Sequence, residues 1–166
     1  MIKPSEAFIA DWGAAVSAPF AEEFSKGLVV LLVLLIPKKM DLKNALVSGL
    51  FVGLSFQIVE DCIFTFQEMF VAKGDGFSTL IERIVHAGGT YWTFSLVFTI
   101  GMVALLAKKT GLSKRQGAFW LFLAILAHFM VNSPFNEGIT SKSANVTIAI
   151  LYFNFCLALA AIKTVD

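Results

Sequence analysis

Long apolar stretches alternate with short polar segments along the whole sequence. A helix needs about 20 mainly apolar residues to cross the hydrocarbon core of a bilayer. Five stretches meet that length when a few polar interruptions are allowed. The pattern predicts an all-α, polytopic transmembrane bundle of about five spanning helices, at about residues 18–36, 44–66, 82–107, 116–134 and 144–162.

The first predicted span has clear signals at both ends. Ser17 is suited to be the N-cap, Pro19 fits the first helical turn, and Pro37 ends the helix. The segment before Ser17 contains the charged residues Glu6 and Asp11. We therefore expect that segment to form a separate interfacial or partial helix.

Composition supports a single membrane domain over residues 1–166. Hydrophobic residues make up 57% of the chain and charged residues 15%, against roughly 25% charged in an average soluble domain. Lys and Arg gather in short connecting segments and form no basic face, which excludes a nucleic-acid partner. Cys62 and Cys156 both lie inside apolar runs, so a disulfide framework is excluded as well.

The distribution of Lys and Arg predicts the orientation, because cytoplasmic loops carry the excess of these residues. Basic residues follow the first, third and fifth predicted spans, whereas the opposite side carries few. We expect a multi-pass protein with its N-terminus outside and its C-terminus in the cytoplasm. The basic residues on the predicted cytoplasmic side are Lys38, Lys39, Lys43, Lys108, Lys109, Lys114, Arg115 and Lys163.

Ionisable and amide side chains interrupt four of the predicted spans. A charge at the bilayer centre costs about 3 kcal/mol on insertion scales, so each one needs a partner or a function. With the orientation above, all of them fall in the outer halves of their helices, at one depth. They are Glu22, Glu23 and Lys26, then Glu60 and Asp61, then Arg83 and His86, and finally His128 and Asn132.

Helical spacing indicates how these side chains face, since residues three or four apart share one side of a helix. Lys26 is therefore expected to neutralise Glu22 or Glu23 and to leave the other carboxylate free to act. On the second span, two glycines share a stripe with Glu60. This stripe predicts the close approach of a neighbouring helix and a Glu60 side chain that faces protein.

Structural interpretations compete with functional ones for each group. The Glu pair can complement a helix N-terminus, and Glu60 with Arg83 can form an ion pair between helices. Asp61 is expected to be an interfacial or hydrogen-bonding group. His86 and His128 are the 2 histidines of the chain and lie at one predicted depth, which favours a functional role for both.

In their order along the chain, these residues resemble the motifs of the PrsW family of intramembrane proteases. That family is related to the CAAX-prenyl-protease and bacteriocin-processing group. The resemblance covers about residues 15–134. The matching residues are Glu22-Glu23 with Lys26, Phe56 with Glu60, Arg83 with His86, and His128 with Asn132.

The resemblance implies hydrolysis of a peptide bond in a membrane-anchored protein or peptide, near the extracytoplasmic side of a bacterial or archaeal plasma membrane. This sequence departs from the family's motif on the second predicted span. Asp61 and Phe64 stand where the family often has Asn and Tyr. No residue in the sequence identifies the substrate.

For the reaction, we expect Glu22, or else Glu23, to be the general base that activates a water. His86 and His128 would polarise the scissile carbonyl or stabilise the oxyanion, and Asn132 would donate a further hydrogen bond or orient His128. No Ser, Cys or Thr is placed beside a His in a way that favours a covalent nucleophile.

Glu60 would hold the water or a histidine. A zinc site is the alternative, because two His and a Glu with an open position form a hydrolytic centre. Its ligands would be His86, His128 and Glu60, or Glu23 in place of Glu60, with another Glu as the base. We favour the metal-free glutamic mechanism, with no cofactor.

Two other classes of protein fit parts of the pattern. Buried Glu, Lys and His also mark ion pathways, as in a small transporter or proton relay. However, the inner halves at residues 28–36 and 99–107 are almost wholly apolar. A non-catalytic scaffold that uses the polar cluster to join its helices is the third interpretation.

Overall fold

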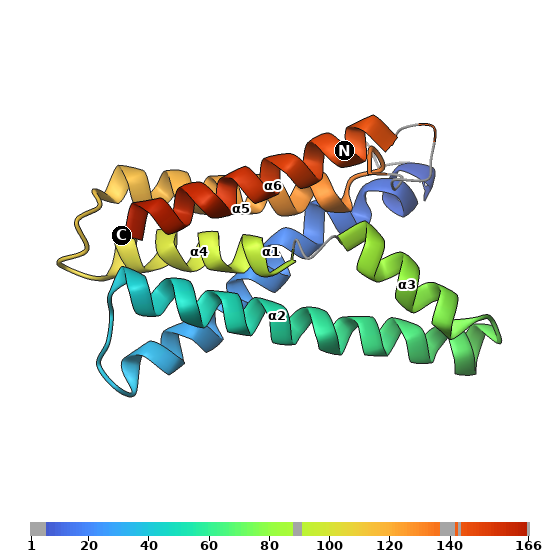
Figure 1. The fold of residues 1–166 in the computed structure, drawn as a ribbon, viewed down its shortest axis with the longest axis horizontal. Helices are drawn as coiled ribbons and strands as arrows, with labels where there is room; N and C mark the ends of the chain where they lie inside the picture. The colour runs from blue at the N-terminus through green and yellow to red at the C-terminus, as the bar shows by residue number, and fades with distance from the viewer. Residues whose placement is uncertain (1–5, 88–90, 137–141, 143, 166) are drawn as a thin grey trace.

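The computed structural model describes residues 6–87, 91–136, 142 and 144–165, without the side chains of Ala7, Ala10, His86 and Ala87. Within these ranges the chain is helical and contains no strand (Figure 1), so the all-α prediction is confirmed. The elements are α1 (Glu6–Leu35), α2 (Leu42–Gln67), the π-helical segment η1 (Glu68–Ala72), α3 (Gly76–Ala87), α4 (Tyr91–Leu106), α5 (Lys114–Asn132) and α6 (Ala144–Val165).

The second, fourth and fifth predicted spans correspond to α2, α5 and α6, with ends that differ by up to three residues. Two of these helices start with a side-chain cap. Asp41 accepts a hydrogen bond from the Asn44 backbone N–H at 3.0 Å, and Ser113 forms a capping box with Gln116. These caps satisfy backbone donors that the first turn leaves without partners.

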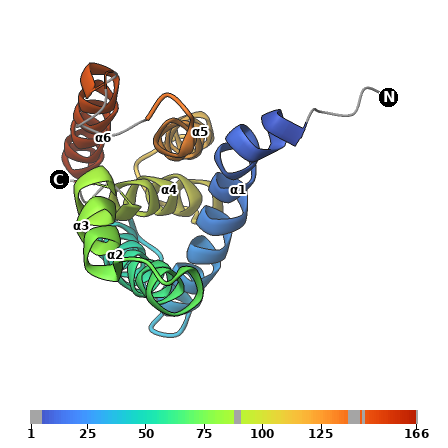
Figure 2. The same ribbon diagram turned by 90° about the vertical axis from the view of Figure 1, so that its right-hand side faces the viewer.

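Helix α4 forms the centre of the bundle. Figure 2 looks along the bundle and shows α4 surrounded by α1, α2, α5 and α6, all of which contact it. Every residue from Thr93 to Gly101 is buried. A helix that is apolar on all sides, as α4 is, belongs in such a central position.

The N-terminal segment does not form a separate helix, so that prediction is wrong. Residues 6–17 are the first part of the continuous helix α1, and Ser17 lies inside that helix, where its Oγ donates to the Gly13 carbonyl at 2.7 Å. Packing explains the continuity: the Trp12 ring lies 5.9 Å from the ring of Phe129 and 5.4 Å from that of Phe135. These aromatic contacts compensate for the backbone hydrogen bond that Pro19 cannot donate.

The continuous helix predicted over residues 82–107 is also wrong. The described chain forms two helices there, α3 and α4, and α3 is inclined away from the bundle axis (Figure 1). The sequence between them is Gly88-Gly89-Thr90, which lies outside the described residues. Each glycine disfavours a helix by about 1 kcal/mol relative to alanine, so a pair of them opposes a single continuous helix.

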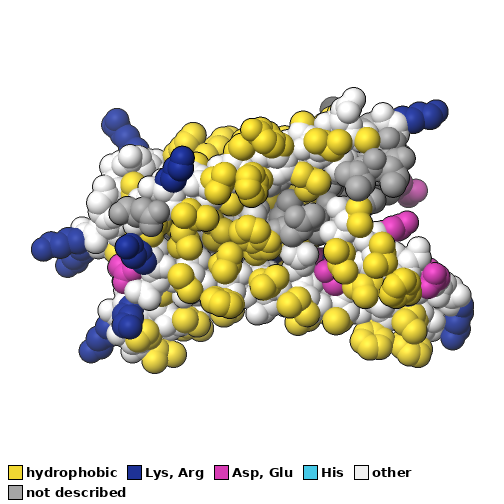
Figure 3. All heavy atoms as spheres, viewed as in Figure 1, with side chains coloured by type: hydrophobic (Ala, Val, Ile, Leu, Met, Phe, Trp, Pro, Cys, Tyr) yellow, Lys and Arg dark blue, Asp and Glu magenta, His cyan; other side chains and the backbone are white. Residues whose placement is uncertain are grey.

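Apolar side chains cover the outside of the bundle. Two helical segments, Leu42–Ala72 and Ala144–Val165, are long and apolar enough to cross a membrane, and only 22% and 33% of their most apolar windows are buried. Figure 3 shows hydrophobic side chains over the middle of the molecule and Lys and Arg gathered toward its ends. This distribution is that of a protein whose outer surface faces lipid.

Candidate active site

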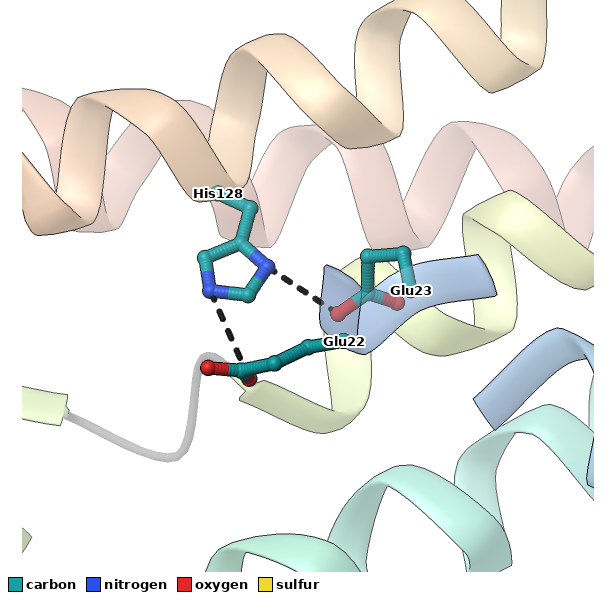
Figure 4. A group of neighbouring side chains, drawn as sticks. All are labelled: Glu22, Glu23 and His128. Carbon is teal, nitrogen blue, oxygen red and sulfur yellow. Dashed lines mark hydrogen bonds and ion pairs between the residues drawn. The ribbon is translucent and has the colours of Figure 1, made fainter. Parts of the chain in front are cut away.

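Glu22, Glu23 and His128 come together between α1 and α5 (Figure 4). The His128 Nδ1 lies 3.0 Å from Glu23 Oε1, and both side chains are fully buried. The other ring nitrogen, Nε2, lies 3.8 Å from Glu22 Oε2. Sequence analysis predicted all three as site residues, and the fold joins them across 105 positions of the chain.

Lys26 completes this cluster from the next turn of α1. Its Nζ lies 2.8 Å from Glu23 Oε1 and 3.2 Å from Glu22 Oε2. Lys26 was predicted to neutralise one of the two carboxylates, but it contacts both. Residues three and four positions before a helical residue lie on the same side of the helix, so the Lys26 side chain reaches Glu22 and Glu23. The ammonium also lies 4.1 Å above the ring of Phe56, a cation–π contact with α2.

Aromatic rings from α4 fix the imidazole. Phe94 stacks on His128 at 4.6 Å with 18° between the ring planes. Tyr91 meets the same imidazole edge-on at 5.8 Å. Because both rings belong to the buried central helix, they hold His128 in place from the side opposite to α5.

Sequence reasoning missed Ser95 of α4. Its Oγ donates to Glu23 Oε2 at 3.0 Å, and the serine is fully buried. The signal in the sequence was weak: a lone serine in an apolar helix commonly bonds to its own backbone.

Glu60, Asp61 and Arg83 form a second polar group beside the first. Arg83 Nη2 lies 3.0 Å from Glu60 Oε2, so the expected ion pair is present. The Arg83 Nε also donates to Asp61 Oδ1 at 2.7 Å, and its guanidinium carbon lies 4.0 Å from the Phe64 ring centroid. Arg83 thereby fastens α3 to α2 through neighbouring carboxylates, which agrees with a hydrogen-bonding role for Asp61.

Two predicted site residues lie further from the cluster or outside the described part. Asn132 lines a polar cleft of about 220 Å³ together with Arg83 and Tyr91. Since Tyr91 also contacts His128, the cleft adjoins the cluster. His86 belongs to α3, but its side chain lies outside the described residues, so its role stays a prediction.

The donor atoms of Glu22, Glu23 and His128 suit a metal ion. One ligand atom from each lies within 4.8 Å of the others, the one group of this kind in the described part of the chain. The Nε2 of His128 is buried and has no hydrogen-bond partner there, while Nδ1 faces Glu23.

This set differs from the ligands predicted for a zinc site, His86, His128 and Glu60. The described structure groups His128 with Glu22 and Glu23, whereas Glu60 is paired with Arg83. Imidazole nitrogen and carboxylate oxygen are nevertheless both zinc ligands in proteins. The residues present therefore fit a metal ion.

Fold and site together define a helical membrane protein with a buried carboxylate and imidazole centre. Residues 1–160 match the family model described as "PrsW family intramembrane metalloprotease". The chain therefore belongs to the PrsW family of intramembrane proteases, as its motifs indicated. Searches of curated proteins and of solved structures each gave no match.

Proposed function

We propose that this protein hydrolyses a peptide bond of a membrane-anchored protein or peptide, near the extracytoplasmic side, with a water activated by Glu22. The observation that carries the proposal is the contrast between the two adjacent glutamates. Glu23 is fully buried and both of its oxygens are bonded to protein groups. Glu22 retains 20% side-chain exposure and lies beside the unpaired Nε2 of His128.

Each neighbour has a distinct part in this reaction. Glu22 accepts the proton of the attacking water, and Lys26 balances the charge of the two carboxylates. Glu23 holds the Nδ1–H of His128, which leaves Nε2 directed to the reacting carbonyl or to the water. Asn132, in the adjoining cleft, donates a hydrogen bond to the developing oxyanion.

Zinc is the alternative way to activate the water. Glu22, Glu23 and His128 would hold the ion, which when bound lowers the pKa of its water to about 7. The contacts of Lys26 favour the metal-free reaction, because its ammonium is bonded to the same carboxylate oxygens that a cation would need.

The proposed topology has five spans, with α3 and α4 together forming the third. The N-terminus lies outside and the C-terminus lies in the cytoplasm of a bacterial or archaeal plasma membrane. Lys and Arg that follow α1 and α4, together with Lys163 in the last turn of α6, support this orientation. It places the cluster in the outer half of the membrane.

The proposal is tested by incubating the purified protein in lipid vesicles with a panel of single-pass membrane peptides. Native protein is expected to cut at least one peptide, and Glu22→Gln to reduce cleavage at least a hundredfold, in the range of a lost general base. Glu6→Gln is the matched control, since Glu6 is an exposed glutamate of the same helix. It should cleave like the native protein.

Two results would contradict the proposal. Glu22→Gln that cuts as fast as Glu6→Gln would remove Glu22 from the reaction. The second is no cleavage by the native protein together with a large loss of stability in Glu22→Gln. The cluster would then hold the helices of a non-catalytic scaffold together.

A further inference from the structure

Ser95 donates a hydrogen bond to Oε2 of the buried Glu23 carboxylate, whereas Lys26 and His128 contact Oε1. We infer that Ser95 is a positioning residue of the active site. It fixes Glu23, and through Glu23 it fixes the orientation of the His128 imidazole. This inference rests on the proposed function and extends the site to the central helix.

The bonds around Glu23 give Ser95 this role. Lys26 and His128 both contact Glu23 Oε1, at 2.8 Å and 3.0 Å, whereas Ser95 Oγ contacts Oε2. Without the serine, the carboxylate is held at one oxygen only and is free to rotate about its terminal bond. Such a rotation would release the Nδ1 of His128.

The hydroxyl proton of Ser95 has two acceptors within reach. Glu23 Oε2 lies at 3.0 Å and the Tyr91 carbonyl at 3.4 Å. The shorter bond goes to the charged acceptor, and hydrogen bonds to charged groups are roughly twice as strong as neutral ones. The Ser95 hydroxyl therefore donates to the Glu23 carboxylate in preference to the backbone carbonyl of Tyr91.

Close packing of α2 on α4 brings Ser95 to this place. A Cβ added at Gly53 would lie 2.8 Å from the Trp92 Cα and 2.9 Å from the Ser95 Oγ. At Gly49 an added Cβ would lie 2.8 Å from the Ser95 carbonyl oxygen. The glycine stripe predicted from the sequence thus provides close approach to α4, at the turn that carries the serine.

Thr99 provides a matched control one turn further along α4. Its Oγ1 donates to the Ala45 carbonyl of α2 at 3.0 Å, and the residue is fully buried. Thr99 therefore joins α4 to α2 through a buried hydroxyl, and its hydrogen bonds go to backbone carbonyls, whereas the Ser95 hydroxyl joins α4 to Glu23 of α1. Ser95→Ala and Thr99→Val each remove one buried hydroxyl from α4.

The kinetic test compares kcat and KM of the two variants on a cleaved peptide. We expect Ser95→Ala to lower kcat roughly tenfold with KM unchanged, the size of one lost hydrogen bond to a charged group. Ser95→Cys, which keeps a weaker donor of similar shape, should lose less. Thr99→Val should keep native kcat. Equal kcat values in Ser95→Ala and Thr99→Val would overturn the inference.

A second measurement needs no substrate. The chain has 2 histidines, so nitrogen-15 labelling of histidine gives few ring signals, and His128→Gln identifies those of His128. Ser95→Ala should shift the Nδ1 signal of His128, and Thr99→Val should leave it unchanged. An unchanged signal in Ser95→Ala would overturn the positioning role, whereas a shifted signal without cleavage by any form would overturn the proposed function alone.

Discussion

At the scale of single residues, the site shows how environment separates two adjacent carboxylates. Glu22 and Glu23 have identical chemistry and share Lys26 as a partner. Burial and the contacts with Ser95 and His128 make Glu23 a structural anchor. Partial exposure leaves Glu22 accessible to a water, which is what a general base requires.

This difference predicts unequal effects on stability. Glu23→Gln leaves the buried ammonium of Lys26 without its closest anion, which should lower the free energy of unfolding by about 3 kcal/mol. Glu22→Gln should lower it by about 1 kcal/mol or less, because Glu22 is partly exposed and Lys26 keeps its shorter contact with Glu23. Thermal unfolding in detergent measures both. Equal losses would show that the two carboxylates are structurally equivalent.

Metal removal gives a prediction at the same scale. Because Lys26 Nζ contacts both carboxylates, we expect peptide cleavage to survive a strong zinc chelator. Metal content of the purified protein is measured in parallel, with His128→Ala as the reference for the residual content. Loss of cleavage in chelator, restored by added zinc, would replace the glutamic mechanism with the zinc centre held by Glu22, Glu23 and His128.

The sequence was sufficient to predict four members of the cluster but not the hydrogen bonds that join its members. Glu22, Glu23, Lys26 and His128 are costly in a membrane, so their presence alone indicated a site. The hydrogen bond of Ser95 to Glu23 depends on which turns of α1 and α4 meet. That relation is set by packing between helices and has no signal within either helix.

At the scale of elements, close helix contacts depend on particular glycines. An added Cβ at Gly101 of α4 would lie 2.7 Å from the Gly117 carbonyl oxygen and 2.8 Å from the Leu121 nitrogen, both in the backbone of α5. Backbone atoms cannot move aside without shifting the whole helix. The crossing of α4 and α5, which places His128 against the rings of α4, therefore requires a glycine there.

We predict that Gly101→Ala lowers the unfolding free energy by about 2 kcal/mol, the usual cost of overpacking a core. Gly13→Ala is the control, because nothing lies within 4 Å of a Cβ added at Gly13. The higher helix propensity of alanine should make that variant neutral or slightly more stable. Gly101→Ala with native thermal stability would show that α5 can move without penalty.

Helix boundaries were the part of the fold least accessible from the sequence. The apolar pattern over residues 82–107 has no polar interruption at Gly88-Gly89, and periodicity alone did not divide α3 from α4. Pro19 indicated a helix start, yet the aromatic contacts of Trp12 extend α1 through it. Tertiary packing extended α1 beyond its predicted start, and the backbone preference of the two glycines opposed a single helix over residues 82–107. Neither effect is visible in the hydrophobic pattern.

At the scale of the whole molecule, apolar side chains cover the middle of the bundle and Lys and Arg gather toward its ends (Figure 3). The five-span topology predicts that the segment between η1 and α3 lies outside and the segment between α4 and α5 lies inside. Asp75→Cys should react with a membrane-impermeant thiol reagent added to intact cells, and Lys109→Cys only after lysis. A background without Cys62 and Cys156 prevents labelling of the native thiols. The reverse labelling pattern would place the cluster near the cytoplasm.

The most direct test of the central claim is mass spectrometry of a membrane peptide incubated with the purified protein in water enriched in oxygen-18. If a water activated by Glu22 attacks the peptide bond, the native protein will yield two fragments, with oxygen-18 in the new C-terminal carboxylate. Glu22→Gln will yield neither fragment above background. Fragments formed equally by Glu22→Gln, or new termini without the isotope, would contradict the account.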